Sequence, residues 1–253
     1  MTRALITGID GFTGRYLAQE LLAAGYAVAG TSHVSAGRGA SEIYACDLRD
    51  AAQVSAVVYR VQPEVVVHLA AISFVAHGNV EDIYMANVVG TRHLLEALAK
   101  QGSAVRKVVL ASSANIYGNS DAGVLDESVP PAPANDYAVS KLAMEYMARL
   151  WMDRLPITIV RPFNYTGVGQ SERFLLPKIV SHFRSRAPAI ELGNLDVVRD
   201  FSDVRTVVQC YRRLLGADTA GSTFNICSGE GHSLQDVLAA MGQATGQGNE
   251  GRV

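Results

Sequence analysis

The sequence predicts a doubly wound α/β fold, which is a parallel sheet with helices on both faces. Short apolar or β-branched runs alternate along the chain with amphipathic segments of helical length. Parallel strands that alternate with such helices imply right-handed crossovers, which cover both faces of the sheet. The 253 residues, of which 49% are hydrophobic, are enough to bury a large core without disulfides or structural metals.

The expected elements follow one another regularly up to about residue 165. Buried strands are expected over residues 4–7, 27–31, 65–68, 105–111 and 157–160. Helices are expected over residues 12–24, 51–60 and 87–100, where Gly25 and Gly102 stop the first and third and Asp50 caps the second. Beyond residue 165 the rhythm becomes irregular, with short elements around residues 190–192 and 224–226 and a helix that starts near Ser233. We therefore expect a main domain over residues 1–165 and a smaller C-terminal lobe over residues 166–253.

Charge and cysteine content argue against several classes of protein. The 22 basic and 24 acidic residues give a net charge of −2 without a run of five like charges, so neither nucleic acid nor a membrane surface is an expected partner. Cys46, Cys210 and Cys227 lie far apart and suggest neither a disulfide framework nor a zinc knuckle, and the histidines lack metal-ligand spacing. We therefore expect no metal site. No signal peptide or 18-residue apolar stretch is present, so we expect a cytoplasmic protein.

A glycine-rich turn is the first chemical signal. Gly8-Ile9-Asp10-Gly11-Phe12-Thr13-Gly14 lies between the first expected strand and helix. Main-chain N–H groups and the helix dipole can hold a pyrophosphate there, so Gly8, Gly11, Phe12 and Gly14 are candidate dinucleotide-binding residues and the main domain a dinucleotide-binding one. The spacing is Gly-x-x-Gly-x-x-Gly rather than Gly-x-Gly-x-x-Gly, and a tight turn without a ligand is the alternative.

The end of the second expected strand bears on the choice of dinucleotide. It reads Thr31-Ser32-His33, where NAD-preferring folds place a carboxylate against the ribose 2′-hydroxyl. The missing carboxylate at Ser32 and a cation at Arg38 favour NADP(H), with NAD(H) still possible, although Arg38 as a solvated loop charge is an equal alternative. Asp47-Leu48 can bind the adenine, or Asp47 can cap the following helix.

The second chemical signal is a set of Ser, Tyr and Lys. Tyr137 and Lys141 are four residues apart on one expected helix face, so their side chains can share a site. A nearby ammonium lowers the pKa of a phenol, which makes Tyr137 usable as a general acid or base. Ser113 follows an expected strand at the carboxyl edge of the sheet and can donate to a carbonyl oxygen. A surface Tyr–Lys pair is the alternative.

These motifs together resemble the extended short-chain dehydrogenase/reductases, the NAD-dependent epimerase/dehydratase family. The resemblance also rests on His68-Leu69-Ala70-Ala71, Asn87-Val88-Val89-Gly90-Thr91, Ser112-Ser113-Ala114-Asn115-Ile116-Tyr117-Gly118 and Arg161-Pro162-Phe163-Asn164, and it covers nearly the whole chain. It implies a Rossmann-type fold and a nucleotide-sugar substrate. Ser113, Tyr137 and Lys141 would be catalytic, Tyr137 and Lys141 would also contact the nicotinamide ribose, and Leu69, Ala70 and Ala71 would border the cofactor.

One branch of that family fits the C-terminal lobe best. Gly193-Asn194-Leu195-Asp196 and Arg199-Asp200-Phe201-x-Asp203-Val204 look like the branch of GDP-mannose 4,6-dehydratases and GDP-4-keto-6-deoxymannose reductases. Asn164, Lys178 and Arg199 would then hold the nucleotide and its diphosphate. Asn115 takes the place of the acid that sugar 4,6-dehydratases carry two residues beyond the catalytic Ser or Thr, and an amide cannot move the C5 proton. We therefore expect NAD(P)H-dependent reduction of a GDP-4-keto-6-deoxyhexose, of the GDP-rhamnose-forming type, with Asn115 as a substrate contact.

Two alternatives remain from the sequence. A nucleotide-sugar 4-epimerase uses the same Ser, Tyr and Lys with a tightly held NAD. A cofactor-binding protein with little activity is the other, because the lobe over residues 166–253 looks truncated beside the longer chains of the family. The resemblance also implies a homodimer through the helices that hold Asn87 and Tyr137. Trp151, Met144, Met147 and Met152 are expected on the Tyr137 helix as a core or interface stripe.

Overall fold

The computed structural model describes all residues except 35–36, 39–40, 74–78, 121–122, 188 and 247–253. It separates into two compact units. Unit 1 comprises residues 1–162 and 205–226, and unit 2 comprises residues 163–204 and 227–253. The chain therefore passes between the units after residues 162, 204 and 226. A single boundary near residue 165 does not describe this division, because residues 205–226 return to complete the first unit.

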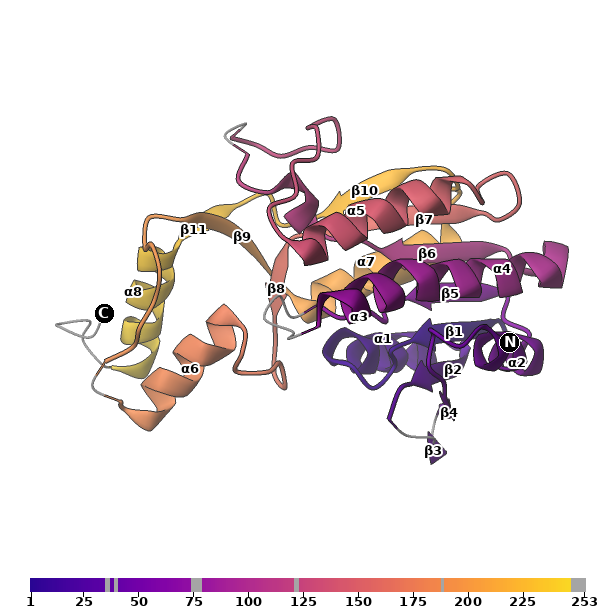
Figure 1. The fold of residues 1–253 in the computed structure, drawn as a ribbon. Coiled ribbons are helices and arrows are strands. Elements are labelled where there is room, and N and C mark those ends of the chain that lie inside the picture. The colour runs from indigo at the N-terminus through magenta and orange to yellow at the C-terminus, as the bar shows by residue number, and fades with distance from the viewer. Residues whose placement is uncertain (35–36, 39–40, 74–78, 121–122, 188, 247–253) are drawn as a thin grey trace. The chain divides into compact units, whose positions relative to one another are not determined.

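Unit 1 is built on an eight-stranded sheet in the order β10-β7-β6-β5-β1-β2-β4-β3 (Figure 1). Its strands are β1 (Arg3–Thr7), β2 (Ala27–Ser32), β3 (Gly37–Arg38), β4 (Glu42–Ala45), β5 (Val65–His68), β6 (Lys107–Ala111), β7 (Ile157–Pro162) and β10 (Thr223–Ile226). All neighbours are parallel except β3 and β4. Every residue of β5, β6 and β7 is buried, as expected of a parallel sheet covered on both faces.

The strand order reverses at β1, which lies between β2 and β5. Thr7 at the end of β1 pairs with Thr31 on one side and His68 on the other. Crossovers leave toward opposite sides of the sheet at such a point, so the carboxyl ends of the strands are open there. This edge is where ligands of open α/β sheets bind.

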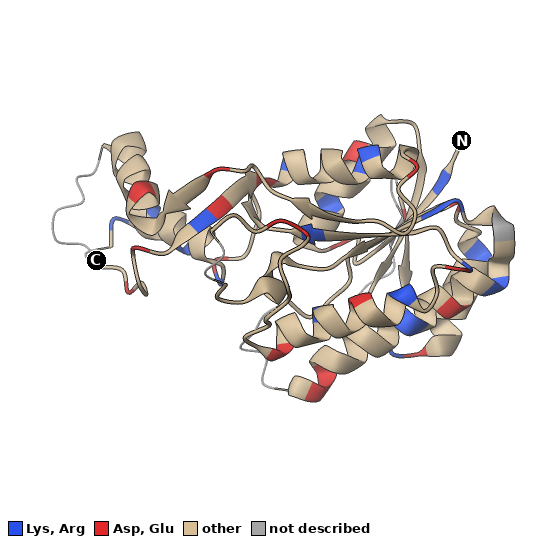
Figure 2. Cartoon of the chain, turned by 90° about the horizontal axis from the view of Figure 1, so that it is seen from above, with Lys and Arg blue, Asp and Glu red and all other residues tan. Residues whose placement is uncertain are grey.

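Helices cover both faces of the unit 1 sheet. They are α1 (Phe12–Ala23), α2 (Ala51–Val61), α3 (Val80–Tyr84), the π-helical η1 (Met85–Gly90), α4 (Thr91–Gln101), the 3₁₀ turns η2 (Gly102–Ala104) and η3 (Ala114–Tyr117), α5 (Asp136–Arg149) and α7 (Val204–Gly216). Asp50 caps α2 by accepting from the N–H groups of Ala52 and Gln53, and Asn135 caps α5 by accepting from Ala138. Figure 2 shows Lys, Arg, Asp and Glu interspersed along these helices.

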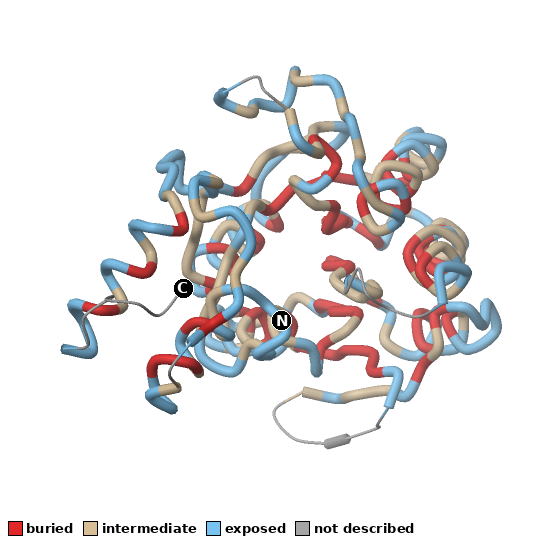
Figure 3. The backbone as a smooth tube through the Cα atoms, turned by 60° about the vertical axis from the view of Figure 1, so that its left-hand side comes forward, coloured by how far each residue is buried: buried red, intermediate tan, exposed pale blue. Residues whose placement is uncertain are grey.

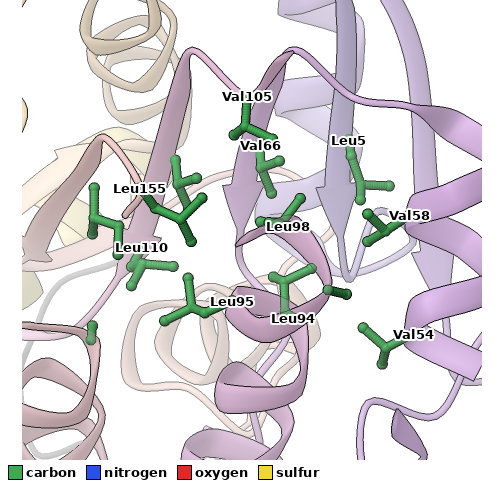
Figure 4. Close-up of a cluster of buried hydrophobic side chains, with 14 of the residues drawn as sticks. Leu5, Val54, Val58, Val66, Leu94, Leu95, Leu98, Val105, Leu110 and Leu155 are labelled. Carbon is green, nitrogen blue, oxygen red and sulfur yellow. The ribbon is translucent and has the colours of Figure 1, made fainter. Parts of the chain in front are cut away.

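The main core lies between one face of the sheet and α2, α4 and α5. Leu94, Leu95 and Leu98 of α4 pack in its centre, flanked by Val54 and Val58 of α2 (Figure 4). On the opposite face, Leu17 and Leu21 of α1 are fully buried, and Glu20 of α1 binds Arg212 of α7 at 2.6 Å. The central strands β1, β5, β6 and β7 accordingly lie in the buried interior, while the helices alternate buried and exposed residues (Figure 3).

Unit 2 is smaller and has its own core. A three-stranded sheet has the order β11-β9-β8, from β8 (Asn164–Thr166), β9 (Val198–Asp203) and β11 (Gly231–Ser233). Its helices are α6 (Leu175–Ser185) and α8 (Leu234–Thr245), and α8 starts with a capping box between Ser233 and Asp236. The core residues are Ile179, Phe183, Ile190, Leu234 and Leu238.

The helix expected over residues 87–100 is present and ends before Gly102, but its first residues form the π-helical η1 before α4 begins at Thr91. Two other expectations about elements are wrong. Residues 190–192 form no regular element. Their apolar character reflects the side chain of Ile190, which packs in the unit 2 core from an irregular segment. Trp151 and Met152 follow α5 in a turn, since that helix ends at Arg149. Within the described residues, no helix is long and apolar enough to cross a membrane.

Candidate active site

The glycine turn between β1 and α1 is shaped by close backbone contacts. Gly8 has φ +70°, which is left-handed and suits glycine. A Cβ on Gly14 would lie 2.2 Å from the Gly8 oxygen, so only glycine allows α1 to start this close to the strand. Gly11 is the N-cap of α1 without a side-chain cap, and no acidic residue occupies the first helical turn. This uncrowded, positive helix end fits the pyrophosphate of a dinucleotide.

The turn is fastened to the end of β2. The N–H groups of Gly8 and Ile9 both donate to the Thr31 carbonyl, at 2.9 and 3.1 Å. The Ser32 hydroxyl donates to Asp10 Oδ2 at 2.7 Å. Ser32 is a cofactor residue expected from the sequence, whereas Asp10 was overlooked, and its place inside the glycine motif was the available signal.

Residues 69–71 follow β5 beside the glycine turn. The N–H groups of Leu69 and Ala70 donate to Thr7 Oγ1 at 3.2 Å, which holds this segment against the end of β1. A Cβ on Gly8 would lie 3.0 Å from Ala70 Cα. The structure therefore brings Ala70 against Gly8, with Leu69 and Ala71 on either side of it in the chain.

A buried hydrogen-bond chain crosses the sheet edge below these segments. Thr91 Oγ1 donates its single proton to the Asn87 carbonyl. It must therefore act as the acceptor toward His68 Nε2, at 2.8 Å. His68 Nδ1 then accepts from Thr7 Oγ1 at 2.7 Å. Burial lowers the pKa of His68 to about 3, with a smaller contribution from the charge of Lys141. His68 is thus neutral and structural, and it links β1, β5 and α4.

The predicted adenine residues have other partners in this structure. The Asp47 carboxylate accepts from the Arg49 guanidinium at 2.8–3.0 Å, and that hydrogen bond lowers the pKa of Asp47. Arg49 also binds Asp82 at 2.9 Å. Leu48 is buried beside Gly90. The Arg38 backbone belongs to β3, while its side chain lies outside the described residues.

Ser113, Tyr137 and Lys141 gather at the carboxyl end of β6. Lys141 Nζ donates to the carbonyl of Ala111, the last residue of β6, at 2.8 Å. The same Nζ lies 5.9 Å from the Tyr137 ring centroid. Ser113 follows two residues after Ala111 and caps η3, where its hydroxyl accepts from the Asn115 N–H and keeps its own proton to donate. The arrangement can move a proton to a substrate oxygen at this edge.

The charge of Lys141 is set by burial and one acid. The side chain is 3% exposed, and burial lowers its pKa from 10.5 to about 8, although Glu145 one turn along α5 raises it. Glu145 itself forms a bidentate ion pair with Arg161 of β7, at 3.0 and 2.7 Å. Burial opposes the charge of Arg161, but Glu145 and Tyr117 outweigh it and raise the pKa of Arg161.

Asn87 holds the helix that carries Tyr137. Its Oδ1 accepts from the Ile72 N–H at 2.9 Å, and its Nδ2 donates to Ser140 Oγ at 3.0 Å. Ser140 Oγ in turn donates to the Tyr137 carbonyl at 2.8 Å. Asn87 lies within the π-helical η1, and such segments occur often at functional sites. It joins the segment after β5 to the first turn of α5.

The residues predicted to contact substrate divide between the units. Asn115 is exposed in η3 of unit 1. In unit 2, Asn164 of β8 donates to the Asp200 carbonyl at 3.4 Å, and Lys178 of α6 donates to the Glu191 carbonyl at 2.7 Å. Arg199 of β9 donates to the Val198 carbonyl. The sequence did not indicate that Asp200 ties β9 to residues 228 and 229 through three hydrogen bonds.

No group of three or more His, Cys, Asp or Glu in the described part of the chain is placed to hold a metal ion. The candidate site comprises the glycine turn after β1 and the Ser113, Tyr137 and Lys141 side chains after β6, with β5 between these two strands. Both lie in unit 1, on the edge where the strand order reverses.

Comparisons with known proteins give the family. The model of the NAD dependent epimerase/dehydratase family matches residues 4–227. GDP-6-deoxy-D-talose 4-dehydrogenase of Aggregatibacter actinomycetemcomitans is 37% identical over 242 residues, which cover 94% of this chain and 79% of that protein. GDP-6-deoxy-D-mannose reductase of Pseudomonas aeruginosa is 30% identical over 250 residues, with 94% and 79% covered.

Solved structures agree with this assignment. A proposed epimerase from Burkholderia cenocepacia J2315 is 54% identical with a TM-score of 0.92, covering 97% of this chain and 82% of that one. RMD from Pseudomonas aeruginosa, complexed with NADPH, is 29% identical with a TM-score of 0.84 and 99% and 84% covered. The UDP-glucose 4-epimerase of Thermus thermophilus, in complex with NAD, is 28% identical with a TM-score of 0.85 and 98% and 84% covered. The chain therefore belongs to the NAD dependent epimerase/dehydratase family, the extended short-chain dehydrogenase/reductases, whose members named above include a dehydrogenase, a reductase and an epimerase of nucleotide sugars.

Proposed function

We propose that the protein reduces the 4-keto group of a GDP-4-keto-6-deoxyhexose, as in the formation of GDP-rhamnose, with Tyr137 as the proton donor. The observation that carries this proposal is the buried Lys141 ammonium, which lies beside the Tyr137 ring and near Ser113 at the end of β6. The GDP-sugar dehydrogenase and reductase among its relatives support the substrate class.

A nicotinamide dinucleotide, when bound, supplies or accepts the hydride. The residues of the chain supply the proton chemistry. Tyr137 Oη gives its proton to the substrate oxygen as negative charge develops there, and Ser113 Oγ donates a hydrogen bond to the same oxygen. The positive charge of Lys141 stabilises the phenolate that remains on Tyr137. Asn164, Lys178 and Arg199 are proposed to hold the nucleotide and its diphosphate.

Asn115 argues against 4,6-dehydratase chemistry. It is exposed two residues beyond Ser113, and its amide cannot accept the C5 proton of a sugar at neutral pH. The residues of η3 from Ala114 to Tyr117 offer no carboxylate in its place. A ketoreductase needs no such base, so the η3 sequence fits reduction better than elimination.

The cofactor is proposed to lie along the glycine turn and residues 69–71, with the adenine near Asp47 and Leu48. The sequence favours NADP(H) because residue 32 is a serine and Arg38 is a cation. The solved relatives include RMD with NADPH and an epimerase with NAD, so they do not favour one dinucleotide over the other. The Asp10 carboxylate accepts from the Ser32 hydroxyl at the end of β2.

A nucleotide-sugar 4-epimerase is the second candidate function. The 54% identity to a proposed epimerase favours it, and Ser113, Tyr137 and Lys141 could serve it equally. An epimerase keeps its dinucleotide and regenerates it in every cycle. Net cofactor consumption therefore separates the two functions.

We also propose a homodimer. Val139, Tyr146 and Leu150 are exposed apolar residues of α5 and its C-cap, with 38, 58 and 79% exposure. Their spacing of seven and four residues places them on one helix face. A second copy of this helix would cover that stripe.

The test is a paired assay with GDP-4-keto-6-deoxymannose and NADPH or NADH. Absorbance of the reduced nicotinamide should fall stoichiometrically with substrate in the wild-type protein. Tyr137→Phe should lower the rate at least about 100-fold, because it removes the proton donor. Tyr59→Phe, an exposed tyrosine of α2, is the matched control and should leave the rate unchanged. A parallel assay offers a GDP-hexose with a free 4-hydroxyl. Formation of its 4-epimer without net oxidation or reduction of nicotinamide, with NAD retained through purification, would instead establish the epimerase.

A further inference from the structure

A carboxylate lies at the end of β2 although β2 itself does not supply one. Ser32 is the last residue of β2, and its hydroxyl donates to Asp10 Oδ2 at 2.7 Å. Asp10 comes from the glycine turn between β1 and α1. In doubly wound dinucleotide-binding folds, an acid at the end of the second strand binds the ribose 2′-hydroxyl of NAD. Here the acid reaches that strand end from the neighbouring turn.

The position of this carboxylate is well defined. The Thr31 carbonyl accepts from two successive N–H groups of the turn, which fixes Gly8 and Ile9 against β2. Ser32 is 1% exposed, and its hydroxyl accepts from the Val34 N–H at 3.1 Å, which directs its proton toward Asp10. Ser32 therefore orients Asp10, while Asp10 is itself exposed and able to meet a ligand.

No cationic side chain in the described part of the structure neutralises the charge of Asp10. Among the described side chains, no lysine or arginine forms an ion pair with Asp10, and Ser32 is its hydrogen-bond partner. Arg49, a cation of the loop that follows β4, is already bound to Asp47 and Asp82. An ionised carboxylate accepts hydrogen bonds but cannot donate them. It therefore attracts a hydroxyl group and repels a phosphate.

We propose that Asp10 selects NAD(H) over NADP(H), by accepting from the ribose 2′-hydroxyl and repelling a 2′-phosphate. Ser32 is the positioning residue that holds the Asp10 carboxylate at the end of β2. This inference rests on the dinucleotide site of the proposed function and specifies its cofactor. It reverses the preference that Ser32 alone suggests, because the acid that β2 lacks is supplied by the turn.

The test measures binding by titrating the purified protein with NADH and with NADPH and following the fluorescence of the reduced nicotinamide. The wild-type protein should bind NADH at least about tenfold more tightly than NADPH, the scale expected for a hydrogen bond to a charged group. Asp10→Asn keeps the size of the side chain and removes its charge. The ratio of the Kd for NADPH to the Kd for NADH should therefore fall about tenfold. Ser32→Ala should lower the same ratio, because it releases Asp10.

Asp153→Asn is the matched control, since Asp153 is an exposed acid before β7, at the amino edge of the sheet. It should leave the Kd ratio unchanged. Tighter binding of NADPH by the wild-type protein, or a Kd ratio that Asp10→Asn does not alter, would overturn the inference while the proposed reduction stands. If neither dinucleotide binds, the dinucleotide site fails, and the proposed function falls with it.

Discussion

Lys141 carries a charge that the folded protein disfavours. Its pKa of about 8, against 10.5 for an ordinary lysine, corresponds to about 3 kcal/mol of destabilisation while the side chain is charged. Lys141→Met removes the charge and one hydrogen bond worth about 1 kcal/mol. We expect the variant to unfold at a higher temperature than the wild-type protein at pH 7, by roughly 2–4 °C per kcal/mol, and to lose activity.

The pH dependence of the free energy of unfolding shows whether the buried charge of Lys141 is the cause of this destabilisation. Between pH 8 and 10.5 the unfolded lysine binds more protons than the folded one, so wild-type stability rises with pH in this window. The difference in Tm between Lys141→Met and the wild-type protein should therefore shrink across it, as measured by thermal unfolding at several pH values. Lys100→Met, in an exposed i,i+4 pair with Glu96, is the control and should show no such trend. A Lys141→Met protein that is less stable than the wild type at every pH would contradict this account of the buried charge.

The sequence predicts single functional residues best where local spacing decides their position. Tyr137 and Lys141 share a face because they are four residues apart, and the structure places them together. The Asp10–Ser32 and Asn87–Ser140 contacts join residues 22 and 53 positions apart, so no local pattern indicates them. The roles proposed for all these residues remain predictions.

At the scale of elements, the start of α1 depends on one glycine. Gly14→Ala would place a methyl group 2.2 Å from the Gly8 oxygen and 2.7 Å from the Ile9 oxygen, both backbone atoms. The helix must then move away from the turn, so we expect a loss of about 1–3 kcal/mol of stability, the range for overpacking, and weakened binding of dinucleotide. Urea unfolding and NADH titration measure the two effects.

Gly216→Ala is the matched control for that change. Gly216 ends α7 with nothing within 4 Å of a Cβ placed on it. Alanine there should leave dinucleotide binding unchanged and stability equal or slightly higher, because it restricts the unfolded chain. Equal losses in the Gly14 and Gly216 variants would show that the glycine turn is not specially constrained.

The Glu145–Arg161 pair fastens α5 to β7 in the buried interior. Their side chains are 0 and 4% exposed, and Arg161 also donates to Tyr117 Oη at 2.9 Å. Glu145→Gln alone should destabilise the protein by about 3–5 kcal/mol, because it leaves a buried guanidinium without its charge partner. Replacing both residues, as Glu145→Leu with Arg161→Met, should recover most of that loss. Urea midpoints compare the variants, and a double variant no more stable than Glu145→Gln would refute this account.

Buried strands and capped helices follow from the sequence because their signals are local. The strand expected over residues 65–68 is β5 as observed, and Asp50 caps α2 as expected. The π-helical η1 was not foreseen, since it shares its apolar pattern with an ordinary helix. The short strands β8, β9 and β11 were missed because their residues are mostly half-buried or exposed and lack alternation.

For the whole molecule, the apolar stripe of α5 leads to a prediction about assembly. If Val139, Tyr146 and Leu150 form the dimer contact, Tyr146→Glu should convert a dimer to a monomer, because a carboxylate would be buried without a partner. Light scattering with size-exclusion chromatography measures the mass. Val168→Glu, at a residue of unit 2 that is 89% exposed, should leave the mass unchanged. A monomeric wild-type protein would exclude the homodimer.

The division into two units is the feature of the whole molecule that the sequence predicts least well. Residues 205–226 follow the unit 2 strand β9, and among them the sequence indicated only a short element around residues 224–226, so that α7 was missed. Their place in unit 1 depends on the pairing of Thr223–Ile226 with residues 159–162 of β7. Such pairing between distant segments has no signature within either segment.

The three passages of the chain between the units bear on how the protein is made. When a ribosome has released β7, the strand that will cover its outer edge, β10, has not yet been synthesised. Translation of the intervening segment takes on the order of seconds, and an unpaired apolar strand edge invites association with other nascent chains. Slowing translation after residue 162 should thus lower the soluble yield, whereas the same delay after residue 226 should not.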